Sequence, residues 1–429
     1  MLADGYDIVL DLEKSHGRRL YDARGQRWLL DMFSFFGTFP VGINHPKLED
    51  ARFLAKLQRA ALVNLTNSDI YTVEMAEFVQ TFGRLAMPAY LPNAFFIAGG
   101  ALGVENALKA AMDWKVRRNF REGAREEKGQ EVLHFRQAFH GRSGYTLSLT
   151  NTADPRKYQY YAKFDWPRVS NPKLRFPIDA AELERVEKAE TESLEQIKAV
   201  FTVKRDQIAC VLIEPIQAEG GDNHFRPEFL SALRDLAHEN DVLLAFDEVQ
   251  TGMGLTGRMW AHEHWDVRPD LLAFGKKTQI CGMLGGGRLD EEPDNVFRVS
   301  SRINSTWGGN LVDMVRCERY LQIIEEDRLL ENAERVGEHL LRGLERIQHE
   351  RPDAVDNARG KGLMCAIDLP DGASRDRVAD RAYELGAIVL PCGERSLRFR
   401  PSLDVTPEEI DEALEIVRRA VDVARVKTA

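Results

Sequence analysis

Short apolar runs alternate with longer amphipathic runs through the middle of this 429-residue chain. The apolar runs have the length of buried strands and lie at residues 93–98, 131–135, 209–214, 242–247 and 271–274. Between them, segments such as 101–116 and 226–239 have the length of helices, and Pro227 stands where the first turn of a helix tolerates a proline. This alternation predicts an α/β fold, a mostly parallel sheet covered by helices on both faces.

The pattern changes after residue 311 and divides the chain into expected domains. A long helical stretch over 312–349 leads to short strands near 363–369, 387–390 and 397–400. The final helix opens with Thr406-Pro407-Glu408-Glu409, a capping box with proline at the first helical position. We therefore expect a large domain over 61–311 and a smaller one over 312–429, with residues 1–60 packing against the smaller domain.

Composition excludes several classes of function. A net charge of −10 argues against a surface for nucleic acid or acidic membranes, both of which need a basic face. No apolar run reaches the ~20 residues of a membrane span, and the first residues lack the features of a signal peptide. Five scattered cysteines without a CxxC pair fit reduced thiols in the cytoplasm and give no metal site.

Two charged residues follow predicted strands, where ligands gather in parallel sheets. Lys276 comes just after the run at 271–274, and Asp247 closes the run at 242–247. Burial lowers the pKa of a lysine, and a neutral amine forms a Schiff base with an aldehyde. The pair thus suggests an imine former and a pyridinium partner for pyridoxal 5'-phosphate (PLP). Taken alone, Lys276 and Lys277 are more simply interpreted as a solvated pair after a strand.

Two further turns follow predicted strands. The segment Ala98-Gly99-Gly100-Ala101 opens a helix, so its backbone N–H groups could hold a phosphate or form only a tight turn. In the segment 138–142, Phe139 could stack on a flat ring and Arg142 could clamp a carboxylate. Singly, Phe139 reads more simply as a core residue and Arg142 as solvated surface.

Two other sequence patterns suggest binding sites, but each is better explained without one. The segment 252–257 fits GxGxxG, but four residues separate it from the strand that a dinucleotide site requires, so we expect a loop. His262-Glu263-His264 suggests a metal site, yet residues two apart on a helix do not face one another, and a solvated helix face is the default expectation.

Together these residues resemble the class III (ω-amino acid) aminotransferases among the fold-type I PLP enzymes, from about Asp11 to the end of the chain. Within that family the likeness is to lysine 6-aminotransferases, through 138–152, 274–279 and 304–310. The resemblance implies PLP fold-type I architecture, a homodimer with shared active sites, and a smaller domain built from the C-terminus and the N-terminal segment.

The resemblance also assigns cofactor contacts by position. It makes Lys276 the Schiff-base lysine and Asp247 the partner of the pyridine nitrogen. It implies phosphate contacts for Gly100 and Ala101, and for Thr306 from the second subunit. It also implies that Phe139 stacks on one face of the ring, that Val249 lies on the opposite face, and that Gln250 is the neighbour of the 3-hydroxyl. Where the family usually carries serine and threonine hydroxyls in the phosphate turn, this chain has Gly99 and Ala101.

Four residues are implied in substrate recognition. Glu219 matches the family's switch glutamate, and Arg398 matches the arginine that binds an α-carboxylate. The resemblance implies that Glu219 either pairs with Arg398 and masks it, or swings away and releases it. Arg142 and Asn304 would hold the α-carboxylate of the donor. Ala218 stands where glycine is common beside the switch.

The implied reaction moves the ε-amino group of L-lysine to 2-oxoglutarate. Alternatives within the family are ornithine or 4-aminobutyrate aminotransferase, a PLP aminomutase and a PLP decarboxylase. A non-catalytic PLP-binding protein is the alternative from another class.

Overall fold

The computed structural model describes residues 5–426, which pack into two compact units. The large unit comprises Leu57–Met253 and Arg258–Leu321. The small unit comprises the described residues up to Lys56, the loop Gly254–Gly257, and the chain from Gln322 onward. The domain boundaries predicted from the sequence, near residues 60 and 311, stay a prediction.

The large unit is built on a seven-stranded sheet with the order β4-β12-β11-β10-β7-β5-β6. Its strands are β4 (Asn93–Ile97), β5 (Glu131–Phe135), β6 (Arg168–Val169), β7 (Ile208–Ile213), β10 (Leu243–Asp247), β11 (Leu271–Phe274) and β12 (Cys281–Gly285). Six strands run parallel, as the strand–helix alternation predicts, and each of the five apolar runs forms a strand. Their carboxyl ends therefore meet at one edge.

The exception is β12, which the sequence analysis missed. It runs antiparallel to both β11 and β4 and separates them in the sheet. Its sequence, Cys-Gly-Met-Leu-Gly, is short and glycine-rich, so it carries a weak strand signal. Glycine is required there, because a Cβ on Gly282 would lie 2.1 Å from the Phe95 carbonyl oxygen.

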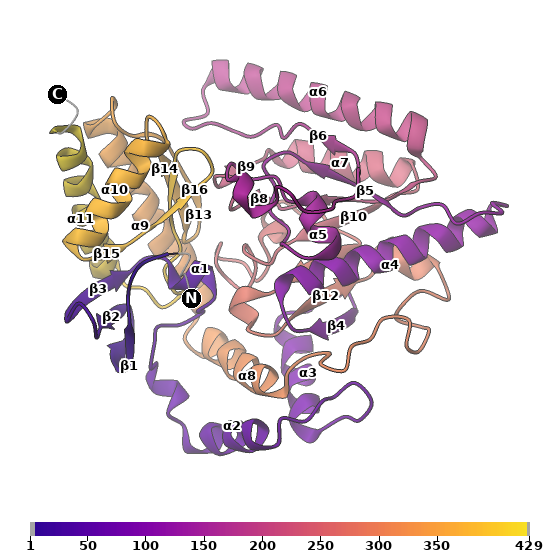
Figure 1. Ribbon diagram of the computed structural model, residues 1–429, viewed down its shortest axis with the longest axis horizontal. Helices are drawn as coiled ribbons and strands as arrows, with labels where there is room; N and C mark the ends of the chain where they lie inside the picture. Colours follow the sequence, from indigo (N-terminus) through magenta and orange to yellow (C-terminus); the bar gives the residue numbers. More distant parts are fainter. Residues whose placement is uncertain (1–4, 427–429) are drawn as a thin grey trace. The chain divides into compact units, whose positions relative to one another are not determined.

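Alternate residues of each strand face two separate cores. One core joins the sheet to α4 (Gly100–Arg121), and the other joins it to α6 (Ala180–Lys204) and α7 (Pro227–Glu239). Figure 1 shows α6 and α7 on one side of the strands and α4 on the other. In β10, for example, Leu243 and Ala245 face α4, whereas Leu244 and Phe246 face α6 and α7.

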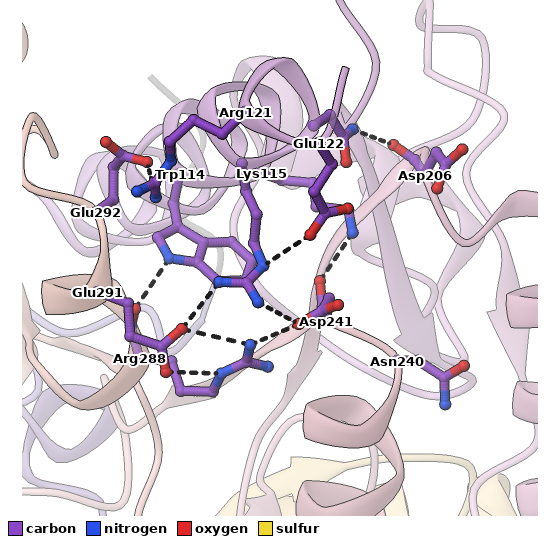
Figure 2. A network of polar contacts seen from close by, with 12 residues as sticks. Trp114, Lys115, Arg121, Glu122, Asp206, Asn240, Asp241, Arg288, Glu291 and Glu292 are labelled. Atoms are coloured by element: carbon purple, nitrogen blue, oxygen red, sulfur yellow. Dashed lines mark hydrogen bonds and ion pairs between the residues drawn. The ribbon is translucent and has the colours of Figure 1, made fainter. Parts of the chain in front are cut away.

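Helix α4 matters for function because it begins at the edge where the strands end. Its other end is fixed by buried polar contacts (Figure 2). The Lys115 ammonium donates to the Asp241 carbonyl at 2.9 Å, and the Trp114 indole donates to the Arg288 carbonyl at 2.9 Å. Arg288 also pairs with the Asp241 carboxylate at 2.7 Å. Burial lowers the pKa of Lys115. These bonds satisfy a buried cation and hold the helix axis in place.

The large unit also contains two further helices and a two-stranded sheet. They are α3 (Val73–Leu85), α5 (Gly144–Leu149), β8 (Ile216–Gln217) and β9 (Asn223–His224). Helices α2 (Ala51–Val63) and α8 (Leu311–Glu326) each cross from one unit into the other.

The small unit contains two four-stranded sheets, with the orders β1-β2-β3-β15 and β13-β14-β17-β16. Their strands are β1 (Leu10–His16), β2 (Arg19–Asp22), β3 (Arg27–Asp31), β13 (Asp356–Lys361), β14 (Met364–Asp368), β15 (Ala387–Ile388), β16 (Leu390–Cys392) and β17 (Ser396–Phe399). The helices are α1 (Ser34–Gly37), α9 (Leu329–Glu350), α10 (Gly372–Leu385) and α11 (Pro407–Val426).

Two expectations for this unit can be compared with the structure. The capping box is confirmed, because Thr406 N donates to the Glu409 carboxylate at 3.0 Å and Glu409 N donates to Thr406 Oγ1 at 3.3 Å. The single helical stretch over 312–349 is wrong, since α8 ends at Glu326 and α9 begins at Leu329. Arg328 breaks the stretch with a φ of 49°, in the left-handed region.

Among the described residues, no helix is both long enough and apolar enough to cross a membrane.

Gly103 tests the packing of α4 on the sheet. A Cβ there would lie 2.6 Å from the Gly282 carbonyl oxygen, so Gly103→Ala should lower the free energy of unfolding by about 1–3 kcal/mol. Gly83, inside α3, has no atom within 4 Å of its virtual Cβ. Gly83→Ala should therefore raise stability, by about 0.5–1 kcal/mol, because alanine favours the helix. Thermal unfolding of both variants measures this; equal shifts would contradict it.

Candidate active site

A cavity of about 250 Å³ lies in the large unit, where the parallel strands end. It is lined by Gly100, Ala101, Phe139, His140, Gly141, Glu214, Glu219, Asp247, Val249, Gln250 and Lys276. These residues follow the five strands β4, β5, β7, β10 and β11, so the sheet itself brings them together.

Lys276 stands in an unusual backbone conformation. Its φ is 54°, in the left-handed region that residues with a Cβ rarely adopt. It opens a short 3₁₀ turn closed by a hydrogen bond from Gln279 N to the Lys276 carbonyl at 2.8 Å. The preceding Gly275 leaves no room for a side chain, because a Cβ would lie 2.9 Å from Cys281 Sγ. Strain of this kind collects at functional residues, and here it sets where the amine enters the cavity.

Asp247 is 5 % exposed and is held by two partners. Its Oδ2 lies 2.7 Å from His140 Nδ1, and its Oδ1 accepts from Val249 N at 3.0 Å. His140 is also buried, and its Nε2 has no hydrogen-bond partner among the described atoms. A carboxylate fixed in this way on the cavity wall suits a protonated ring nitrogen.

Glu214 adds a buried carboxyl group beside this pair. It follows β7 and accepts backbone hydrogen bonds from Phe139 N at 2.9 Å and Ala218 N at 3.0 Å. Burial raises the pKa of Glu214 to about 7, with His140 opposing the shift and Asp247 adding to it. Glu214 therefore fixes the two loops that carry Phe139 and Glu219, and it titrates near neutral pH.

The N-terminus of α4 forms the opposite wall. Gly99 precedes it with a φ of 99°, which glycine adopts freely. Gly100 lies against Val249, since a Cβ at Gly100 would approach Val249 Cγ1 to 2.8 Å. The first N–H groups of a helix have no carbonyl within the helix, so these positions can donate to an anion.

The residues of the cavity fit PLP. A lysine, a held carboxylate and a helix N-terminus supply what an aldehyde, a pyridinium nitrogen and a phosphate each require. Eight of the twelve predicted site residues line the cavity, namely Gly100, Ala101, Phe139, Glu219, Asp247, Val249, Gln250 and Lys276.

Four predicted residues do not line it. Arg142, Asn304 and Thr306 belong to the large unit and are exposed, while Arg398 belongs to the small unit and is buried. Arg142 directly follows Gly141, which does line the cavity. Their expected roles stay predictions.

His140, Gly141 and Glu214 are lining residues that the sequence analysis did not assign. Glu214 shows the same sequence pattern as Asp247, because each is a carboxylate at the end of an apolar run. His140 and Gly141 sit between the assigned residues Phe139 and Arg142.

His262 corrects another expectation. It is 1 % exposed, so the solvated helix face predicted for 262–264 is wrong at this position. Its Nδ1 lies 2.7 Å from Glu248 Oε1 and its Nε2 lies 2.5 Å from the Tyr90 hydroxyl. Glu248 also accepts from the backbone N–H groups of Ala261 and His262. The cluster fixes the 3₁₀ turn Ala261–His264 beside the strand end that carries Asp247. The loop expected over 252–257 is present as turns.

A family model described as aminotransferase class-III matches residues 1–421. The chain belongs to the class-III aminotransferases.

Relatives at 50–52 % identity share one name. The chain is 52 % identical over 424 residues to the "L-lysine-epsilon aminotransferase" of Mycobacterium tuberculosis, covering 99 % of this chain and 94 % of the relative. It is 50 % identical over 425 residues to the enzyme of that name from Streptomyces clavuligerus, covering 98 % of this chain and 92 % of the relative. The mouse mitochondrial 4-aminobutyrate aminotransferase is 33 % identical over 425 residues, covering 94 % and 82 %.

A solved structure described as "Lysine aminotransferase from M. tuberculosis in the internal aldimine form" superposes on this chain with a TM-score of 0.96. It has 52 % identity and covers 99 % of this chain and 97 % of that one. The predicted α/β fold of a PLP enzyme, the aminotransferase activity and the PLP cofactor are thereby confirmed. The non-catalytic alternative is not supported.

Glu214 gives a prediction for pH dependence. Because the folded chain keeps a proton on Glu214 that the unfolded chain loses above 4.5, the wild type loses stability as pH rises from about 4.5 to about 7. Glu214→Gln has no such titration. From pH 5 to pH 8, the free energy of unfolding of Glu214→Gln should therefore rise by about 1–3 kcal/mol relative to that of the wild type. Thermal unfolding of both proteins at each pH measures this difference.

Glu192, exposed on α6, provides the control. Glu192→Gln should differ from the wild type by the same amount at both pH values. A difference for Glu214→Gln that does not change with pH would contradict a proton held on Glu214.

Proposed function

We propose that this aminotransferase moves the ε-amino group of L-lysine to 2-oxoglutarate, giving L-glutamate and 2-aminoadipate 6-semialdehyde, which cyclises onto its own α-amine. The observation that carries this proposal is the 50–52 % identity to enzymes named for the lysine reaction, across nearly the whole chain. The identity to 4-aminobutyrate aminotransferases is 31–34 %, so that alternative has less support.

PLP supplies an aldehyde that links to amines and a ring that accepts electrons. We propose that Lys276 would hold the cofactor through Nζ and would move a proton to and from the substrate carbon. Asp247, oriented by His140 at 2.7 Å, keeps a proton on the ring nitrogen. Phe139 and Val249 enclose the ring from its two faces.

Two proposed sets of contacts hold the rest of the cofactor. The backbone N–H groups of Gly100 and Ala101 bind the phosphate, and the side chain of Gln250 binds the 3-hydroxyl. A threonine hydroxyl from a second copy of the chain, Thr306, completes the phosphate site. Thr306 is exposed and is not among the residues that line this cavity, which is consistent with a contact donated by a second copy.

Substrate carboxylates need cationic partners. We propose that Arg142 and Asn304 bind the α-carboxylate of lysine, and that Arg398 binds the α-carboxylate of 2-oxoglutarate. Glu219, on the cavity wall, would pair with Arg398 during the lysine half-reaction and release it for the acceptor. We also propose a cytoplasmic location, consistent with five buried free cysteines.

A panel of amine donors tests the proposed substrate. With PLP-loaded protein and 2-oxoglutarate, L-lysine should give a kcat/KM at least about tenfold above L-ornithine and 4-aminobutyrate, because a pocket built for one length and charge pattern rejects the others. Lys276→Ala should lose both turnover and the visible absorbance of lysine-bound cofactor. Preference for ornithine, or released carbon dioxide, would contradict the assignment.

A homodimer has independent support from exposed apolar side chains. The segment 62–73 exposes six of them by 40–80 %: Leu62, Val63, Leu65, Ile70, Tyr71 and Val73. Surfaces of this kind on a single chain indicate an interface with another protein, here a second copy.

Sedimentation analysis tests the dimer. The wild type should sediment at twice the 48.7 kDa mass of the chain, and the double variant Ile70→Asp/Tyr71→Glu should shift to monomer and lose activity. Val203 on α6 is 82 % exposed, and Val203→Glu should remain dimeric and active. An active monomer would contradict shared active sites.

A further inference from the structure

Glu219 has a partner that the reaction scheme above does not use. Lys157 Nζ forms an ion pair with Glu219 Oε1. The two residues are 62 positions apart, so their meeting is a product of the fold rather than of local sequence. Lys157 ends the 3₁₀ turn Pro155–Lys157, in the loop between α5 and β6.

The pair is shielded from solvent on both sides. Each side chain is 18 % exposed, well below a surface ion pair such as that of Arg156 and Asp154, where the arginine is 83 % exposed. Reduced exposure weakens screening by water and salt, so the charge of Lys157 acts on its surroundings more strongly than a surface lysine would.

The backbone around Glu219 is rigid. Ala218 N donates to Glu214 Oε2 at 3.0 Å, and Gly221 N donates to the Ala218 carbonyl at 3.2 Å. Gly220 packs against the Gln137 carbonyl oxygen, because a Cβ at position 220 would lie only 2.0 Å from that oxygen. With the backbone held in this way, the position of the Glu219 carboxylate depends on its side-chain torsions and on its partners, of which Lys157 is one.

The loop that carries Lys157 is anchored as well. The Asp154 side chain accepts from Arg156 N at 3.1 Å and caps the turn. Further along, Phe164 N donates to Ser148 Oγ at 2.9 Å. These bonds hold the turn against α5, so that Lys157 reaches the cavity wall from a defined position.

The charges around the cavity give this pair a consequence for substrates. Asp247, Glu214 and Glu219 place carboxyl groups on the cavity wall, and in the proposed reaction the Lys276 amine on that wall is used to hold the cofactor. Lys157 balances the Glu219 charge without taking part in the cofactor chemistry. An anionic substrate meets a less negative cavity because Lys157 is present.

We propose that Lys157 is a specificity-determining residue that neutralises Glu219 and thereby admits a dicarboxylate 2-oxo acid as the amino acceptor. This inference rests on the proposed function, because it concerns the acceptor half of that reaction. Removing the positive charge disfavours a dianionic acceptor, and it leaves unchanged or favours L-lysine, whose net charge is positive.

The two half-reactions separate this effect from a general loss of activity. In Lys157→Gln, kcat/KM for 2-oxoglutarate should fall about three- to tenfold, while kcat/KM for L-lysine stays equal or rises. Glutarate, a dicarboxylate that cannot accept an amino group, should bind about three- to tenfold more weakly by titration calorimetry. Lys157→Arg keeps the charge and should restore both quantities.

Lys163 provides a matched control on the same loop. Its Nζ is exposed and donates to the backbone carbonyls of Tyr158 and Tyr161, each at 2.8 Å. Lys163→Gln removes the same charge without touching Glu219, so both half-reactions and glutarate affinity should match the wild type.

Three outcomes decide the proposal. A selective loss for the acceptor and for glutarate in Lys157→Gln supports it. Equal losses in both half-reactions, or unchanged glutarate affinity, overturn it and leave Lys157 a structural residue. A wild-type enzyme that takes no amino group from L-lysine would refute the proposed donor instead, and the glutarate titration would still report on Lys157.

Discussion

The hydrogen bond between Asp247 and His140 joins the ends of β10 and β5 inside the protein, and the site depends on it. A buried carboxylate needs a partner to remain ionised, and an ionised Asp247 is what a pyridinium ring requires. Glu214 lies at the end of β7, the strand between them, and its hydrogen bonds to Phe139 N and Ala218 N fix the adjoining loops. The Asp247 carboxylate is thus held by neighbouring strands of the sheet rather than by its own loop alone.

Much of this arrangement could be predicted from the sequence. Five apolar runs marked five strands, and the rule that ligands gather where parallel strands end brought Asp247 and Lys276 together. That rule needs only the order of elements along the chain, not the order of strands in the sheet. For this reason the site was recognisable although β12, which separates β4 from β11, was missed.

The remainder could not be predicted because it depends on contacts between distant residues. His262 looked like a solvated helix residue until the fold placed Glu248 and Tyr90 on its two ring nitrogens. Nothing near Lys157 in the sequence indicates Glu219, 62 positions away. The Cys281 Sγ atom that leaves no room for a side chain at Gly275 likewise belongs to β12, the strand that the sequence did not reveal. Local patterns identify elements, whereas partners of buried charges are fixed by topology.

An aminotransferase with a cationic donor and a dianionic acceptor must take both in one cavity, and electrostatics limits how it can do so. A wall of uncompensated carboxylates would suit a cationic donor and exclude a dianionic acceptor. Here Glu214 reduces that conflict by holding a proton near neutral pH, as its raised pKa of about 7 indicates, and Glu219 reduces it by pairing with Lys157. Glu214 and Glu219 therefore add less negative charge to the wall on which Asp247 also lies. If Glu219 acts as the proposed switch, the cavity would change its response to a substrate through one side chain, because the sheet that supports it carries the other lining residues.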